Sequence, residues 1–96
     1  MFDVLLSAAA ERDLEEIFDY TLNEFGLDQA EKYTLKFQDS FDQLAVHPQS
    51  GRLRNEVKEG IRSLQKGSHI IFFRILNDHI LIVRILHMSR DVQRFI

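Results

Sequence analysis

The stretch "SHIIFFRILNDHILIVRILH", residues 68–87, contains two apolar runs that flank Asn77-Asp78. Ile, Val and Phe dominate both runs, which is typical of β-strands. Asn-Asp between two such runs predicts the two-residue turn of a β-hairpin. A third run, "IRSLQK" at residues 61–66, precedes the hairpin and is separated from it by Lys66-Gly67. The sequence therefore predicts a three-stranded antiparallel meander in the C-terminal half.

The predicted turn also fixes which residues lie opposite each other in the hairpin. A regular hairpin closed at residues 77–78 pairs Arg74 with Leu81 and Ile71 with Arg84. Because side chains alternate along a strand, Arg74 should share a face with His87, and Arg84 should point to the other face. A β-bulge would shift this register and change the faces.

The N-terminal half carries helical patterns after a short strand at residues 2–6. Ser7 is a good N-cap for a helix that ends at Gly26, and Asp28 is a plausible N-cap for a second helix that ends near Pro48. Both helices have apolar stripes at three- and four-residue spacing, so they should form an antiparallel hairpin over one face of the sheet. The predicted fold class is α+β, with an N-terminal strand, a two-helix hairpin and the meander in a single domain of residues 1–96.

Composition excludes several classes of site. The chain has no cysteine, which rules out disulfides and thiolate metal sites. His47, His69, His79 and His87 lack the spacing of a metal site, so we predict no metal and no cofactor. No apolar run approaches the length of a membrane span, and the first residues lack the basic segment of a signal peptide. We therefore expect a cytoplasmic protein without a membrane partner.

Charge is divided unevenly along the chain. Residues 1–51 hold eleven acidic and three basic side chains, a net charge of −8, whereas residues 52–96 hold nine basic and four acidic ones, a net charge of +5. Two interpretations remain open at this point. The basic half could face an anionic partner, or the two halves could simply attract each other.

The order of elements, together with "LSAAAERDLEEIFDYT", "LAVHPQSGRLRNEVKEGIRSL", "HIIFFRI" and "VRILHMSRD", resembles the ParE branch of the ParE/RelE toxin superfamily over nearly the whole chain. The resemblance implies a RelE/ParE-like fold and a toxin of a type II toxin–antitoxin module, as in plasmid stabilisation. It implies a ParD-like antitoxin as partner, with operator DNA reached only through the antitoxin complex. The ParE branch implies inhibition of DNA gyrase, and the RelE branch implies ribosome-dependent cleavage of mRNA. A third alternative is a member that only binds its antitoxin and operator DNA.

Residue chemistry bears on the choice between the branches. Metal-free RNA cleavage needs a base, an acid and cations near the phosphate. Arg74, Arg84 and His87 are the candidate catalytic residues, but the predicted register keeps the two arginines on opposite faces. An acidic chain is also a poor binder of RNA. We therefore favour a gyrase inhibitor that acts by binding over an enzyme.

The partner surfaces can be predicted only by residue type. We expect the gyrase-binding surface to use the basic residues of the C-terminal half, namely Arg52, Arg54, Arg84, Arg90 and Arg94. The resemblance places the antitoxin along the helix hairpin and the sheet, so the exposed members of Leu14, Phe18, Phe37 and Phe41 are the candidate contacts. Tyr20 and Phe18 lie beside this stripe, and one of them could be exposed for a partner.

Overall fold

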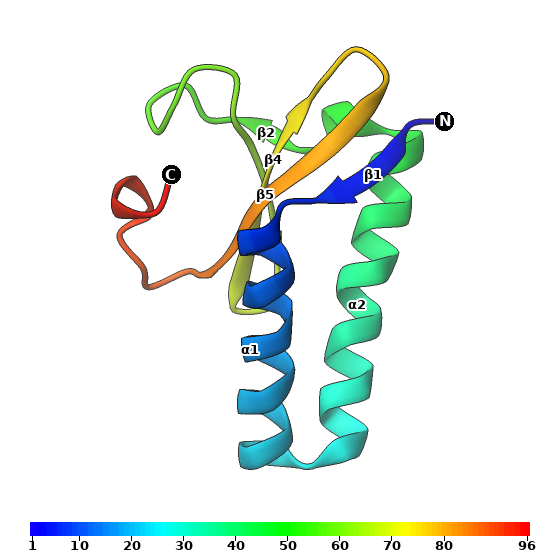
Figure 1. The fold of residues 1–96 in the computed structure, drawn as a ribbon, viewed down its shortest axis with the longest axis vertical. Coiled ribbons are helices and arrows are strands. Elements are labelled where there is room, and N and C mark those ends of the chain that lie inside the picture. Colours follow the sequence, from blue (N-terminus) through cyan, green and yellow to red (C-terminus); the bar gives the residue numbers. More distant parts are fainter.

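The computed structural model describes all residues, 1–96, and shows a helix hairpin packed against one twisted sheet (Figure 1). The elements are β1 (Asp3–Leu6), α1 (Ala8–Phe25), α2 (Leu27–Val46), η1 (Pro48–Ser50), β2 (Arg52–Leu53), β3 (Arg62–Lys66), β4 (His69–Ile75), β5 (His79–His87) and η2 (Val92–Arg94). The predicted strand, helix hairpin and meander are all present, so the fold class is confirmed.

The sheet has five strands in the order β1-β5-β4-β3-β2. Strand β1 pairs with β5 in parallel, and the remaining neighbours are antiparallel. Strand β2 was not predicted, because its two residues lie inside a polar loop and are too few to show an alternating pattern. It pairs Arg52 with Ser63 at the edge of the sheet.

The helix ends follow from local chemistry. The Ser7 side chain accepts the backbone N–H of Ala10 at 3.0 Å, which confirms Ser7 as the N-cap of α1. Gly26 lies between the two helices, where it ends α1 and precedes α2. Its φ of +91° is a backbone conformation that favours glycine. The prediction of Asp28 as the second N-cap is wrong, because α2 already begins at Leu27 and Asp28 lies in its first turn.

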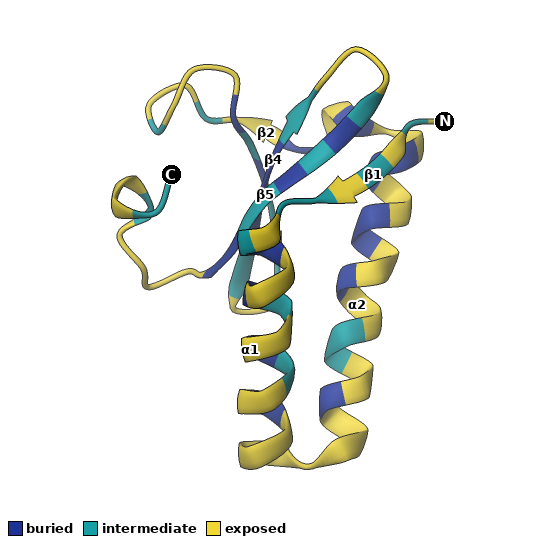
Figure 2. Ribbon diagram, viewed as in Figure 1, coloured by how far each residue is buried: buried dark blue, intermediate teal, exposed yellow.

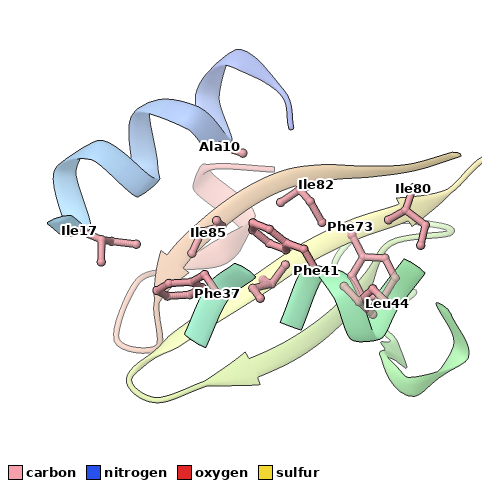
Figure 3. Close-up of a cluster of buried hydrophobic side chains, with 10 residues drawn as sticks. Ala10, Ile17, Phe37, Phe41, Leu44, Phe73, Ile80, Ile82 and Ile85 are labelled. Carbon is pink, nitrogen blue, oxygen red and sulfur yellow. The ribbon is translucent and has the colours of Figure 1, made fainter. Parts of the chain in front are cut away.

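The main core lies between the helices and the sheet (Figure 3). The apolar stripe of each helix supplies buried side chains that contact Ile and Phe side chains of β4 and β5. This cluster consists of Ala10, Ile17, Phe37, Phe41, Leu44, Ile71, Phe73, Ile80, Ile82 and Ile85. The opposite sides of both helices are exposed (Figure 2).

The second face of the sheet, away from the helices, is also partly covered. Ile61, Phe72 and Leu86 are buried there beneath Val57 of the β2–β3 loop and the C-terminal residues Val92, Phe95 and Ile96. Gln93 donates a hydrogen bond to the Glu56 carbonyl at 3.3 Å, which joins the two covering segments. The apolar end of the chain therefore docks on its own sheet.

A bulge changes the predicted register of the β4–β5 hairpin. The turn is as expected, and Arg74 pairs with Leu81, but the register shifts between Phe72 and Phe73. Arg84 consequently pairs with Phe72, so the predicted pairing of Arg84 with Ile71 is wrong. The extra residue in β5 reverses the faces of all the residues that follow it.

Neither helix combines the length and the apolar character that crossing a membrane requires.

Gly51 is required by a close approach of the backbone to the core. A Cβ atom at this position would overlap the ring of Phe73, which is fully buried. We expect Gly51→Ala to lower the free energy of unfolding by about 1–3 kcal/mol, as overpacking does. Urea unfolding measures this, with Ser50→Ala at the exposed neighbouring position as the control. Equal stability of the two variants would contradict the expected clash.

Candidate functional site

One carboxylate joins α1 to the bulged part of β5. The Nε and Nη2 atoms of Arg84 donate to the two oxygens of Asp13 at 2.8 and 2.9 Å. Asp13 also accepts the backbone N–H of Ile85 at 2.9 Å. The Asp13 side chain is only 8% exposed and the Arg84 side chain 21%. This carboxylate therefore has three donors, two from a cation and one from a strand edge.

The C-terminal segment also contacts the guanidinium group of Arg84. It lies 5.4 Å from the ring centroid of Phe95, and that of Arg90 lies 5.1 Å from the same centroid. The hydrogen bonds to Asp13 raise the pKa of Arg84, against the effect of partial burial. Arg84 is therefore a fixed cation that is already paired.

Two histidines face each other at the end of the β4–β5 hairpin that lies away from its turn, on the side of the sheet that the helices cover. His69 and His87 are direct cross-strand partners, and their ring centroids are 5.3 Å apart. The Tyr33 hydroxyl lies 2.7 Å from Nδ1 of His69, and the Ser89 N–H donates to Nδ1 of His87 at 3.1 Å. Partial burial and the neighbouring His87 lower the pKa of His69 from 6.5 to about 4, although Asp13 acts to raise it.

Two grooves meet at this histidine pair. The first, of about 480 Å³, runs between α1 and the C-terminal segment, and we call it the Arg84 groove. The second, of about 340 Å³, lies between the two helices and the strand ends, and we call it the lysine groove because Lys32 and Lys36 line it. Tyr20, His69 and His87 belong to both grooves.

The structure does not bring the three candidate catalytic residues together. Arg74 lies on the second face of the sheet, where its Nη1 donates to the Glu59 carbonyl at 2.9 Å. The prediction that Arg74 shares a face with His87 is wrong, because the bulge moves His87 to the helix side. The prediction that the register separates Arg74 from Arg84 is also wrong, since Arg84 pairs with Phe72, which shares its face of the sheet with Arg74. Arg84 and His87 do line one groove, but Arg84 is bound to Asp13.

The predicted target-binding arginines fall into two groups. Arg84 is bound to Asp13, and Arg54 binds Glu56 and donates to the Ser63 hydroxyl at 3.2 Å. The Arg54 hydrogen bond lowers the pKa of Glu56. Arg52, Arg90 and Arg94 are exposed and have no carboxylate partner.

The predicted antitoxin contacts also divide. Phe37 and Phe41 are 1% and 5% exposed and belong to the main core. They are therefore packing residues and not antitoxin contacts, because no partner can reach them on the folded chain. Leu14 and Phe18 are half-buried on α1 and stay available as predicted contacts. Tyr20, at 62% exposed, is the more accessible of the Phe18 and Tyr20 pair.

Sequence reasoning missed four residues that line the grooves. His69, Tyr33, Lys32 and Lys36 were not singled out as site residues. The spacing of the two lysines, four residues apart in a helix otherwise rich in acid, is a signal that could have found them. The His69–His87 pairing depends on the bulge, which no sequence pattern indicates. No group of three or more potential metal ligands is present.

The Asp13–Arg84 contact should be important for stability. Asp13→Asn keeps the size of the side chain but removes the charge that Arg84 binds. We expect the free energy of unfolding to fall by about 2–4 kcal/mol, because a largely buried guanidinium loses its counter-charge. Chemical unfolding measures this, and Asp19→Asn on the exposed side of the same helix is the control. A loss no larger than that of the control would show that the contact contributes little.

The lowered pKa of His69 predicts a pH-dependent stability. Between about pH 6.5 and 4 the unfolded chain binds more protons than the folded one, so the free energy of unfolding falls as the pH falls. The full lowering corresponds to about 3 kcal/mol, which partial solvent exposure reduces to about 1–2 kcal/mol. His69→Gln should flatten the pH dependence of the melting temperature in this range, whereas His47→Gln at an exposed position should not. Parallel curves for wild type and His69→Gln would refute the assignment.

The chain is similar to known proteins over almost its whole length. It matches the family model described as "ParE toxin of type II toxin-antitoxin system, parDE" over residues 4–92. It is 43% identical over 91 residues to "Toxin ParE1" of Mycobacterium tuberculosis (strain H37Rv), with 94% of this chain and 93% of the relative covered. It is 32% identical over 88 residues to "Toxin ParE1" of Caulobacter vibrioides, with 92% and 91% covered.

Solved structures show the same fold. A chain from the chromosomal ParDE toxin–antitoxin system of P. aeruginosa has a TM-score of 0.78 at 24% identity, with 91% of this chain and 96% of that chain covered. A chain of the toxin–antitoxin complex RelBE2 from Mycobacterium tuberculosis has a TM-score of 0.61 at 24% identity, with 90% and 96% covered. From the family model and the sequence relatives, this chain belongs to the ParE toxin family of type II toxin–antitoxin systems.

Proposed function

We propose that this chain is a toxin that inhibits DNA gyrase by binding to it, and that a ParD-like antitoxin neutralises the toxin. Membership of the ParE family over residues 4–92 is the observation that carries the proposal. Operator DNA is then reached only through the complex with the antitoxin. The cytoplasm, where gyrase acts, is the corresponding location.

The geometry around the histidine pair supports action by binding rather than by RNA cleavage. A phosphodiester-cleaving site needs cations that are free to meet the developing charge on the phosphate. Arg74 is on the opposite face of the sheet from His87, and Arg84 is paired with Asp13. Arg74, Arg84 and His87 therefore do not place two free guanidinium groups beside a residue that could act as acid or base.

The exposed arginines of the C-terminal half supply the proposed gyrase surface. Arg90 and Arg94 lie in the C-terminal segment, which the Gln93–Glu56 hydrogen bond holds beside the loop that follows Arg52. None of these three arginines pairs with a carboxylate of its own chain. Unpaired guanidinium groups on an ordered segment are suited to bind carboxylate or phosphate groups of a target.

The antitoxin is the second proposed partner. The solved structures of similar fold come from a ParDE system and a RelBE2 toxin–antitoxin complex, which makes an antitoxin the expected partner of a toxin in this family. The half-buried Leu14 and Phe18 of α1 are the contacts we retain from the predicted apolar stripe.

Inhibition of gyrase supercoiling by the purified chain tests the proposal. We expect wild type to inhibit, and Arg90→Glu/Arg94→Glu to need at least about tenfold more protein, the effect of roughly 1.4 kcal/mol of lost binding. Arg12→Glu, which removes an exposed cation of α1, is the control. Arg84 is unsuitable for charge reversal, because losing its bond to Asp13 would destabilise the fold.

A ribosome–mRNA cleavage assay runs in parallel with the supercoiling assay. Cut mRNA with intact supercoiling would overturn gyrase inhibition in favour of an mRNA interferase. Equal inhibition by wild type and the double variant would leave gyrase as target but refute the arginine surface.

A further inference from the structure

Strand β1 leaves one edge of the sheet open. It is the outermost strand and pairs with β5 alone, to which the Ser7 N–H also donates. Because backbone groups point to alternate sides along a strand, the N–H and C=O groups of Val4 and Leu6 point the other way, out of the sheet. Phe2 has this outward orientation too, and its N–H donates to the last turn of α2 at 2.8 Å. Val4 and Leu6 have no such partner, so their donors and acceptors are open.

The open edge lacks most of the features that prevent edge strands from pairing. Natural sheets protect their edges with charged side chains, proline, bulges or very short strands. The opposite edge follows this rule, because β2 has only 2 residues and one of them is Arg52. Strand β1 has 4 residues, no proline, no basic side chain and no bulge, and its only charge is Asp3 at the first position. Its Leu5 side chain is 52% exposed, so the edge is also apolar.

The open groups of β1 are complementary to themselves. When two copies of β1 run antiparallel about a two-fold axis through Leu5, Val4 of each copy lies opposite Leu6 of the other. Residues that face each other in this way exchange both hydrogen bonds, so every open group finds a partner. The two Leu5 side chains then meet at the axis, where opposed Cα atoms are about 4.5 Å apart. Val4 and Leu6, which pack against the main core, extend that core towards the second copy.

The two ends of β1 also carry complementary helix termini. Helix α2 ends beside the start of β1, where Phe2 donates to Ala45, and α1 begins directly after the end of β1, capped by Ser7 (Figure 1). Antiparallel pairing brings the carbonyl end of α2 in one copy towards the amide end of α1 in the other. These helix ends carry partial charges of opposite sign, which attract each other. Ala8 and Ala9 form the first turn of α1 and are small enough to permit the approach.

We propose that β1 is a dimerisation edge, at which two copies of this chain join their sheets into one continuous sheet with five strands from each copy. A second copy fits this edge because the backbone groups, the Leu5 contact and the helix ends all match under one two-fold axis. The exposed Arg90 and Arg94 belong to the C-terminal segment, outside the edge. The inference goes beyond the proposed function and depends on neither gyrase nor the antitoxin.

Sedimentation velocity of the purified chain at increasing concentration tests the proposal. The pairing is short and buries little area, so we expect a weak dimer with a Kd on the order of tens of micromolar. Leu5→Lys should weaken the dimer at least about tenfold, because like charges then face each other across the axis. Leu53→Lys changes an exposed leucine of the opposite edge strand and should alter the Kd by less than about twofold. A wild-type chain that stays monomeric up to about 1 mM would overturn the proposal.

A pair of charge variants identifies the axis. Leu5→Glu alone should dimerise as weakly as Leu5→Lys, whereas an equimolar mixture of the two variants should recover the dimer. Only a two-fold axis through position 5 brings the two opposite charges together. Leu5 is more than half exposed, so both variants should fold, and circular dichroism checks this. A folded mixture that dimerises no better than its components would refute the axis.

Amide hydrogen exchange of the whole chain locates the contact. The N–H groups of Val4 and Leu6 should exchange slowly in the wild-type dimer and quickly in Leu5→Lys, whereas the Ser7 N–H, which is bonded to β5, should be protected in both. A dimer without protection of Val4 and Leu6 would place the contact elsewhere and overturn the proposal. Protection of these two amides only after the antitoxin is added would overturn it in favour of a strand from that partner. None of these outcomes depends on the supercoiling assay.

Discussion

The carboxylate of Asp13 is the contact on which the arrangement of the site depends. Strand β1 pairs with β5 only as far as Ile82, after which the edge of β5 would be left open. Ser7 continues the hydrogen bonding along the edge of β5 for one more residue. Its N–H donates to the Ile82 carbonyl, and its hydroxyl donates to the Val83 carbonyl. Asp13 then accepts the Ile85 N–H and binds Arg84. Helix α1 therefore supplies the partner that a longer strand would have provided, and an open edge is avoided.

The bulge in β5 has direct consequences for the chemistry of the molecule. It lets Arg84 turn to the edge, toward Asp13, while Ile82 and Ile85 both stay in the main core. It also moves His87 to the helix side, opposite His69, and leaves Arg74 behind on the second face. The grooves on either side of the histidine pair thus follow from one extra residue in a strand. An arginine that could have been a free cation becomes a structural one.

Much of the fold could be predicted because its signals are local. The caps at Ser7 and Gly26, the stripes of the helices and the turn at Asn77-Asp78 each depend on neighbouring residues. The bulge could not be predicted, since Asp13 and Arg84 are 71 residues apart. The same limit explains the error at Phe37 and Phe41: an amphipathic stripe shows which side chains share a face, but not whether the fold or a partner covers that face. The lysine pair was visible in the sequence, yet only the structure places it beside His69.

The division of charge along the chain can now be interpreted. If the acidic and basic halves served mainly to attract each other, ion pairs between them would be numerous. Of the three contacts between acidic and basic side chains, Arg54–Glu56 and Asp78–His79 are local, and only Asp13–Arg84 joins the two halves. Most of the charge of both signs therefore remains at the surface, where its long-range field acts on other molecules. An acidic helix hairpin and a basic C-terminal segment therefore place surfaces of opposite charge on separate parts of the molecule.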